Sequence, residues 1–189
     1  MSNSNLFRLA GWSAYLSAVA TILGAVTLVI FFSVGDPFGK INDVSSIVIA
    51  LASIPMLLAL HKLHRNVFYA LSFGALIVGI AAMLIAGIVQ TLFVFGVFQY
   101  EQTVYVSPLG FGLFGVAIAV YGYLARVGKI FPSALSVLGM LAGIGYALVA
   151  FGFLLGGENH LFSYVGGSIA VIAYPFWAIW LGRQLLSRR

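Results

Sequence analysis

The stretch 46–65 constrains the fold of this chain more than any other. Its apolar residues run from 47 to 60 and are interrupted only by Ser53 and Pro55, and a basic cluster follows directly at 61–65. Because the hydrocarbon core of a bilayer is about 30 Å thick and an α-helix rises about 1.5 Å per residue, this stretch is long enough to cross a membrane. It predicts a spanning helix that enters the aqueous layer at its basic end.

Composition extends this prediction to the whole chain. The 189 residues are 62% hydrophobic and 7% charged, with a mean hydropathy of +1.12, which a soluble protein could not hide from water. Six apolar runs are each long enough to span a bilayer. These runs are 9–34, 44–60, 67–98, 105–124, 131–155 and 161–181. We therefore predict an all-α, polytopic membrane protein, a bundle of six transmembrane helices in a single domain, 1–189.

Two of these runs are longer than a span requires. The first continues past the signal-peptide-like segment 18–20 to Val34, which predicts a retained helix rather than a cleaved leader. The third, 67–98, is expected to tilt, to bend near Gly87 or Gly96, or to project from the membrane.

The basic residues predict how the spans are oriented. Eight of the nine Lys and Arg residues fall at the N-terminus, in the second and fourth loops and at the C-terminus: Arg8, Lys62, Arg65, Arg126, Lys129, Arg183, Arg188 and Arg189. Lys40 shares the opposite side with all four acidic residues: Asp36, Asp43, Glu101 and Glu158. Since Lys and Arg in short loops stay in the cytoplasm, both termini are predicted to be cytoplasmic, in a cell (inner or plasma) membrane.

The same composition argues against several classes of function. The chain has no cysteine, so it offers no disulfide, thiolate metal site or cysteine nucleophile. Its net charge of +5 is spread between apolar runs, so the lipid bilayer is the expected partner and nucleic acid is not. No Asp, Glu, Lys or Arg is placed within the hydrocarbon core, which argues against proton-coupled transport and intramembrane hydrolysis. We expect no catalytic residues and no cofactor.

Small residues form seams along several predicted helices. Such seams let backbones approach closely, which helices in lipid need because lipid supplies no hydrophobic force for their association. The seams comprise Ser13, Ser17, Thr21 and Gly24, then Gly115 and Ala119, and then Gly139, Gly143 and Ala147. Packing within the chain is the simpler expectation, and a membrane-protein partner or a second copy of the chain is the alternative.

His61 and His64 lie three residues apart and so share one face at the inner end of the second predicted helix. A metal site there would need further ligands, and the inner side offers no carboxylate or cysteine. We therefore expect no metal. Both histidines are interpreted as interfacial residues at a helix C-terminus, whose partial negative charge favours cations.

The segment 35–43 is the most structured polar connection. Asp36-Pro37 is typical of a turn, and Asn42 or Asp43 with Ser46 is typical of a helix N-cap. Asp36 and Asp43 could also form an outer cation site with three further residues, since hard cations prefer oxygen ligands. These residues are Glu101, Glu158 and His160. The topology already explains their outward placement, so this site is the weaker hypothesis.

Pro55 and Pro175 lie at similar depth in the second and sixth predicted helices. Each removes an amide hydrogen and frees the carbonyl four residues earlier, at Leu51 and Val171. A freed carbonyl can bind an ion or a polar substrate group, whereas most such prolines only shape the bundle. We favour the shaping role.

Aromatic residues crowd the outer ends of the third and fourth predicted helices. They are Phe93, Phe95, Phe98, Tyr100, Tyr105, Phe111 and Phe114. They could line a vestibule for a lipid, quinone or carotenoid, although an interfacial aromatic belt is the simpler interpretation.

Two parts of the chain carry a resemblance to known sequences. VGDPFGKIND at 34–43, followed by ALHKLHR at 59–65, is similar to a pattern in uncharacterised prokaryotic multi-span membrane proteins. RLAG at 8–11 and LGMLAGIGY at 138–146 are similar in style to six-helix families of unknown function. The resemblance implies a bacterial or archaeal cell membrane and carries no activity with it.

Three classes of function remain. The small-residue seams favour a non-catalytic helix-packing or accessory protein of a membrane assembly. The paired prolines favour the second class, a small carrier or channel for an apolar or small solute. An intramembrane enzyme comes last, because no nucleophile, base and orienting group can be assembled.

Overall fold

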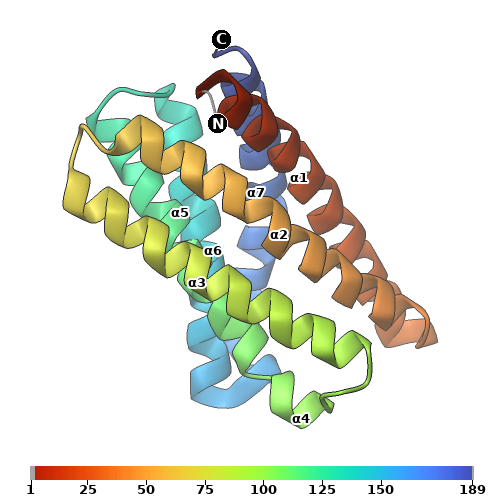
Figure 1. Cartoon of the computed structure of the whole chain (residues 1–189). Coiled ribbons are helices and arrows are strands. Elements are labelled where there is room, and N and C mark those ends of the chain that lie inside the picture. Colours follow the sequence, from red (N-terminus) through yellow and green to blue (C-terminus); the bar gives the residue numbers. More distant parts are fainter. Residues whose placement is uncertain (1–2, 189) are drawn as a thin grey trace.

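The computed structural model describes residues 3–188, which form six long helices joined by short connections (Figure 1). The long helices are α1 (Asn3–Val34), α2 (Phe38–His64), α3 (Tyr69–Val94), α5 (Val106–Val127), α6 (Ser133–Gly156) and α7 (Leu161–Leu186). A single turn, α4 (Tyr100–Thr103), precedes α5, and a 3-10 turn, η1 (Gly157–Asn159), joins α6 to α7. Within the described residues, six helices are long and apolar enough to cross a membrane, so the chain is a multi-pass membrane protein.

The six long helices form a closed ring in chain order. Each one packs against the next, and α7 packs back against α1. Helix α2 also touches α5 across the ring. As a result, the two termini lie beside each other at the same end of the bundle (Figure 1).

Small residues, including those of the predicted seams, make the closest contacts between the helices of this ring. A Cβ atom added at Gly143 of α6 would overlap the carbonyl oxygen of Gly115 on α5, and one at Gly182 of α7 would lie 2.9 Å from the carbonyl oxygen of Gly11 on α1. The polar members of the α1 seam are buried as well: Ser13, Ser17 and Thr21. Such close backbone approach supplies the contact that lipid does not drive. The predicted packing within the chain is confirmed for these seams.

Helix α3 is shorter than the apolar run that contains it. It ends at Val94, and 95–99 form a loop in which Gly96 has a φ of +73°. Glycine adopts this left-handed conformation without the steric cost that a side chain brings, so the helix stops although the sequence stays apolar. The expected third span 67–98 is therefore a helix followed by a loop.

Helix α2 begins at Phe38, well before the predicted start at 44. Gly35, with a φ of +84°, turns the chain after α1, and Pro37 precedes the first helical residue. Asp43 consequently lies inside the helix, whereas the sequence predicts it at the helix N-cap. This difference decides the character of the site described below.

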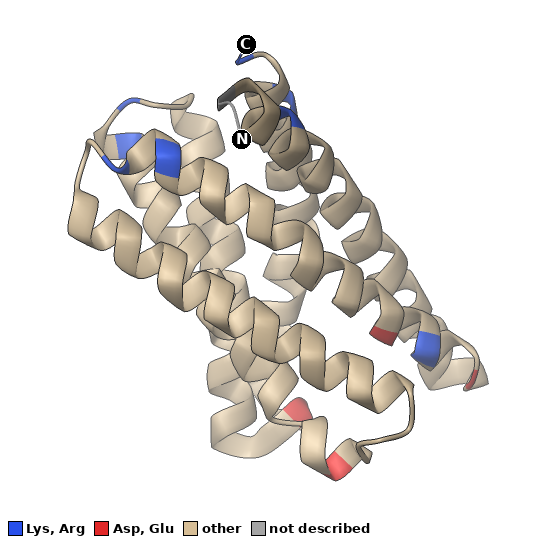
Figure 2. Cartoon of the chain, viewed as in Figure 1, with Lys and Arg blue, Asp and Glu red and all other residues tan. Residues whose placement is uncertain are grey.

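The charged residues lie at the two ends of the ring (Figure 2). We name them the basic end, where Lys and Arg gather beside the termini, and the acidic end, where Asp and Glu gather. Lys40, in the first turn of α2 and beside Asp36, belongs to the acidic end. Arg189 lies outside the described residues. Between the two ends, apolar side chains face outward; Val29 is 70% exposed and Phe176 is 66% exposed. This outward surface is the one that lipid covers.

Candidate functional site

A chamber opens inside the acidic half of the ring. Its volume is about 340 Å³, and all six long helices contribute to its wall. One lining residue from each helix, in chain order, is Thr21, Ser46, Gln90, Ser107, Tyr146 and Gly167. Ligand pockets commonly measure about 300–1,000 Å³, so the chamber has room for one small molecule.

A smaller cavity of about 150 Å³ adjoins the chamber, and we name it the vestibule. The two share part of their walls, including Asp43, Gln90 and Ser107. The vestibule extends to Tyr100 and Thr103 of α4, the short helix at the acidic end. The chamber is therefore continued toward the acidic end of the protein.

Three side chains from three helices form a hydrogen-bonded chain on this shared wall. Gln90 Nε2 donates to Asp43 Oδ1 over 2.7 Å, and Ser107 Oγ donates to Gln90 Oε1 over 2.9 Å. Gln90 is only 7% exposed, and both ends of its amide are engaged. Because an unpaired polar group is costly in a membrane protein interior, this chain fixes the position of the Asp43 carboxylate.

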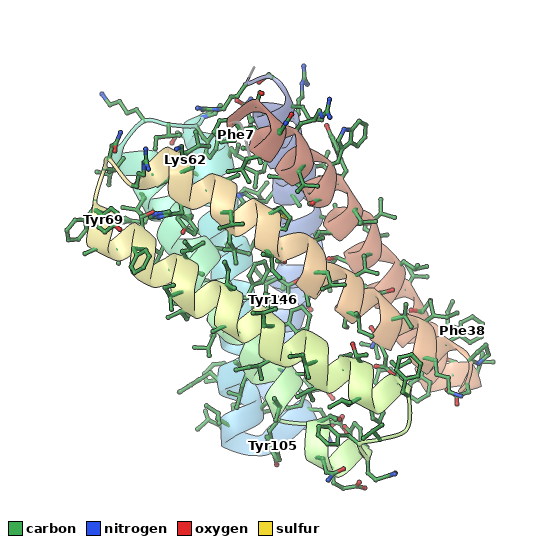
Figure 3. The ribbon with its side chains drawn as sticks, viewed as in Figure 1. Phe7, Phe38, Lys62, Tyr69, Tyr105 and Tyr146 are labelled. Atoms are coloured by element: carbon green, nitrogen blue, oxygen red, sulfur yellow. The ribbon has the colours of Figure 1, made fainter. Side chains whose placement is uncertain are left out.

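A cluster of aromatic rings lies behind the chamber wall and reaches the chamber through Tyr146. The Tyr146 ring lies 5.4 Å from the ring of Tyr174, which in turn lies 6.0 Å from the ring of Phe114. Tyr174 is completely buried, and its hydroxyl shares a hydrogen bond of 2.5 Å with Ser17 Oγ. Figure 3 places Tyr146 midway along the bundle, between Lys62 at the basic end and Tyr105 at the acidic end. We name Phe114, Tyr146 and Tyr174 the aromatic floor.

The basic half of the ring, beyond the aromatic floor, is filled with side chains. Its largest buried members are each less than 2% exposed: Leu57, Leu60, Tyr121, Leu124, Leu135, Leu181 and Leu185. The chamber is thus a local feature of the acidic half and not a general looseness of the bundle.

His61 and His64 lie in the last turn of α2 in different surroundings. His64 is completely buried, its Nδ1 donates to the carbonyl oxygen of Leu60 over 2.6 Å, and its ring lies 5.4 Å from that of Tyr121. Its Nε2 has no hydrogen-bond partner among the residues that the structure describes. His61 is half-buried and shares a hydrogen bond of 2.9 Å with Ser72 Oγ. His64 is therefore a core residue, although the sequence had suggested an interfacial one.

The acidic residues of the outer loops do not come together. Asp36 Oδ2 lies 4.0 Å from Lys40 Nζ, and Glu158 accepts a hydrogen bond of 3.0 Å from the hydroxyl of Tyr100. His160 caps the N-terminus of α7 with its side chain. Across residues 3–188, no group of three or more His, Asp and Glu residues could hold a metal ion. The five-residue outer cation site is not assembled.

Pro55 and Pro175 lie inside α2 and α7, and both helices continue through them. Leu51, whose carbonyl Pro55 frees, points its side chain outward and is 61% exposed. Val171, whose carbonyl Pro175 frees, belongs to the wall of the chamber. The predicted shaping role of the two prolines stays a prediction, and binding by a freed carbonyl stays the alternative.

The crowded aromatic residues have several different locations. Phe111 lines the chamber, Phe93 and Tyr100 line the vestibule, and Phe114 belongs to the aromatic floor. Phe95, in contrast, is 78% exposed. The cluster is thus partly a cavity lining and partly an outward surface.

A larger groove of about 790 Å³ runs along the outside of α6 and α7. Its walls include Leu141, Ile172 and Phe176, which face outward. The groove lacks the few converging polar groups that orient a ligand, so we assign it to the lipid-covered surface and not to a specific site.

Comparison of the chain with protein-family models, with curated proteins and with solved structures finds no match. The resemblance to uncharacterised multi-span proteins therefore identifies no family. The fold defines the class, a six-helix multi-pass membrane protein, and the chamber has to be interpreted from its own geometry.

Sequence reasoning did not single out Gln90 or Ser107. Gln90 is the one amide side chain in the predicted span 67–98, and this was a usable signal because strongly polar side chains inside a bilayer are costly and often functional. Its partners lie 47 and 17 residues away in the sequence, so their convergence required the fold.

Proposed function

We propose that this protein is a carrier that binds a small solute in the chamber. The observation that carries the proposal is that residues of all six long helices line one open volume in the acidic half of the ring, while the basic half is filled with buried side chains. A bundle with only a packing role gains by filling both halves, because empty space forfeits van der Waals contacts. An open, polar-edged chamber is the arrangement expected of a binding site.

The accessory role, which the sequence favoured, has less support. It rested on the small-residue seams and on the absence of ionisable groups in the hydrocarbon core, and the seams are occupied inside the ring, which leaves less of them for a partner. The outward surface that remains is dominated by large apolar side chains that suit lipid.

We further propose that both termini are cytoplasmic, so that the chamber faces the outside of the cell membrane. The gathering of Lys and Arg at one end of the ring supports this orientation, since such residues stay on the cytoplasmic side. A solute from outside would then reach the aromatic floor through the vestibule. Release of the solute to the cytoplasm requires a second conformation in which the rings of the aromatic floor move apart, as in alternating-access transport.

Filling the chamber tests the proposal. A Cβ at Gly167 of α7 would meet only one atom within 4 Å, Val149 Cγ2 at 4.0 Å, so Gly167→Leu fits and extends into the chamber. We expect solutes that raise the melting temperature of the wild-type protein to bind this variant about tenfold or more weakly. The measurement is thermal unfolding in detergent, followed by tryptophan fluorescence, with a set of small water-soluble solutes.

Gly74→Leu is the matched control, because Gly74 is exposed on the outside of α3 and a Cβ there meets nothing within 4 Å. It carries the same substitution and should leave binding unchanged. If Gly167→Leu folds and binds every solute as the wild type does, the chamber is not the binding site.

A further inference from the structure

We infer that the solute is an organic cation, an ammonium group attached to a small apolar body. This inference rests on the proposed carrier function and names the chemistry of its ligand. It follows from the Asp43 carboxylate, from the absence of a protein counter-ion beside it, and from the apolar and aromatic remainder of the wall.

The Asp43 carboxylate contributes to the walls of the chamber and the vestibule, and its hydrogen-bond partners, Gln90 and Asn42, are both uncharged. Oδ1 accepts the hydrogen bond from Gln90, and the half-buried residue contributes to both cavity walls. Gln90 is itself held by Ser107, so the carboxylate is fixed in place before any ligand arrives. A fixed acceptor loses less free energy to ordering when it binds, which favours recognition.

The protein supplies no cation to this carboxylate in the part of the chain that the structure describes. The walls of the chamber and the vestibule contain no Lys or Arg. Lys40, on the same helix, lies 4.0 Å from Asp36 and lines a groove between α1 and α2 instead. Ionised groups inside a membrane protein are normally paired, and here the missing partner is a positive charge brought by the ligand.

The rest of the wall favours an organic cation over a bare metal ion. A hard cation needs six or more oxygen ligands, whereas much of this wall is apolar, with Leu28, Val149 and Ala170 among its members. Phe111 and Tyr146 add aromatic rings, which attract ammonium groups through the electrons of the ring face. A volume of about 340 Å³ also exceeds what a single ion fills.

Choline and its uncharged carbon isostere, 3,3-dimethylbutan-1-ol, test the inference as a matched pair. The purified full-length protein is melted in detergent with each probe at equal concentration, and sodium chloride controls for ionic strength. We expect choline to raise the melting temperature, with an apparent affinity about tenfold or more above that of the alcohol. Asp43→Asn should remove this preference, and Asp36→Asn, at an exposed carboxylate of the same end, should retain it.

Ser46→Lys provides a second variant that does not depend on the folding of Asp43→Asn. Ser46 lines the chamber three residues after Asp43, so a lysine there places a tethered ammonium beside the carboxylate. It should abolish the choline shift without loss of thermal stability.

The outcomes separate the two proposals. Equal shifts with both probes, a preference that survives in Asp43→Asn and in Ser46→Lys, or a shift that sodium chloride reproduces would overturn cation recognition and leave the chamber as a site for other solutes. Absence of any shift with both probes, and with every solute of the wider set, would overturn the carrier proposal as well.

Discussion

Replacing Gly143 with valine is expected to prevent α6 from packing against α5. A Cβ at this position overlaps the carbonyl oxygen of Gly115 and lies 2.6 Å from the backbone nitrogen of Ala119, and neither backbone atom can move without shifting its helix. Overpacking of this kind costs about 3 kcal/mol or more when backbone must yield. We expect Gly143→Val to lower the free energy of unfolding by that amount, measured by circular dichroism during titration with a denaturing detergent.

Gly74→Val controls for the substitution itself. It introduces the same β-branched residue into a helix, but at an outward position where a Cβ meets nothing within 4 Å. Its unfolding curve should lie close to that of the wild type. Equal curves for Gly143→Val and the wild type would mean that α5 and α6 do not approach each other as closely as described.

Truncation of Tyr174 to alanine should be comparably damaging. Its ring is completely buried and contacts three others, those of Phe114, Tyr146 and Trp177. Removing a buried aromatic side chain leaves a cavity and typically costs about 3–5 kcal/mol. We expect Tyr174→Ala to unfold at a correspondingly lower denaturing-detergent concentration.

Tyr174→Phe separates ring packing from the hydrogen bond. It keeps the ring contacts and removes the hydroxyl, which bonds to Ser17 and to Ser53, and interhelical hydrogen bonds in membrane proteins contribute about 0.6 kcal/mol on average and rarely more than about 1.7. The loss should therefore be several times smaller than for alanine. Equal losses of unfolding free energy in the two variants would show that the hydroxyl of Tyr174, and not its ring packing, stabilises the aromatic floor.

The architecture could be predicted from the sequence because each spanning helix is encoded locally. About twenty largely apolar residues suffice to identify a span, and the run that ends at Leu60 shows this without reference to any other part of the chain. The seams were predictable for the same reason, since small residues such as Gly139 and Gly143 recur at helical spacing on one face.

The site was not predictable in the same way, because it depends on one helix boundary and on contacts between distant segments. Asp43 follows Gly39 and Lys40 in a polar segment, which is typical of a loop, yet α2 already includes it. That boundary turns an expected N-cap residue into a carboxylate that bonds to Gln90 inside the ring. The burial of His64 likewise depends on Tyr121 and Phe131, which lie far away in the sequence.

Cysteine accessibility tests most directly whether the chamber admits a solute from the acidic end, since the chain has no cysteine of its own and every single-cysteine variant is free of background. Ser107→Cys lies on the chamber wall, Ile172→Cys lies on the lipid-covered surface with an exposed fraction of 63%, and Glu101→Cys in α4 reports the acidic end itself. Cells that express each variant are treated with a water-soluble, membrane-impermeant cationic thiol reagent.

We expect fast labelling at Glu101→Cys, slower but complete labelling at Ser107→Cys that choline retards, and none at Ile172→Cys. A cysteine at Lys62 or Arg126, at the basic end, should react only after the membrane is opened. Labelling at the basic end in intact cells would reverse the orientation. An unreactive Ser107→Cys in a protein whose Glu101→Cys reacts would contradict the central claim, because a chamber that receives a solute from the acidic end must admit a reagent of that size and charge.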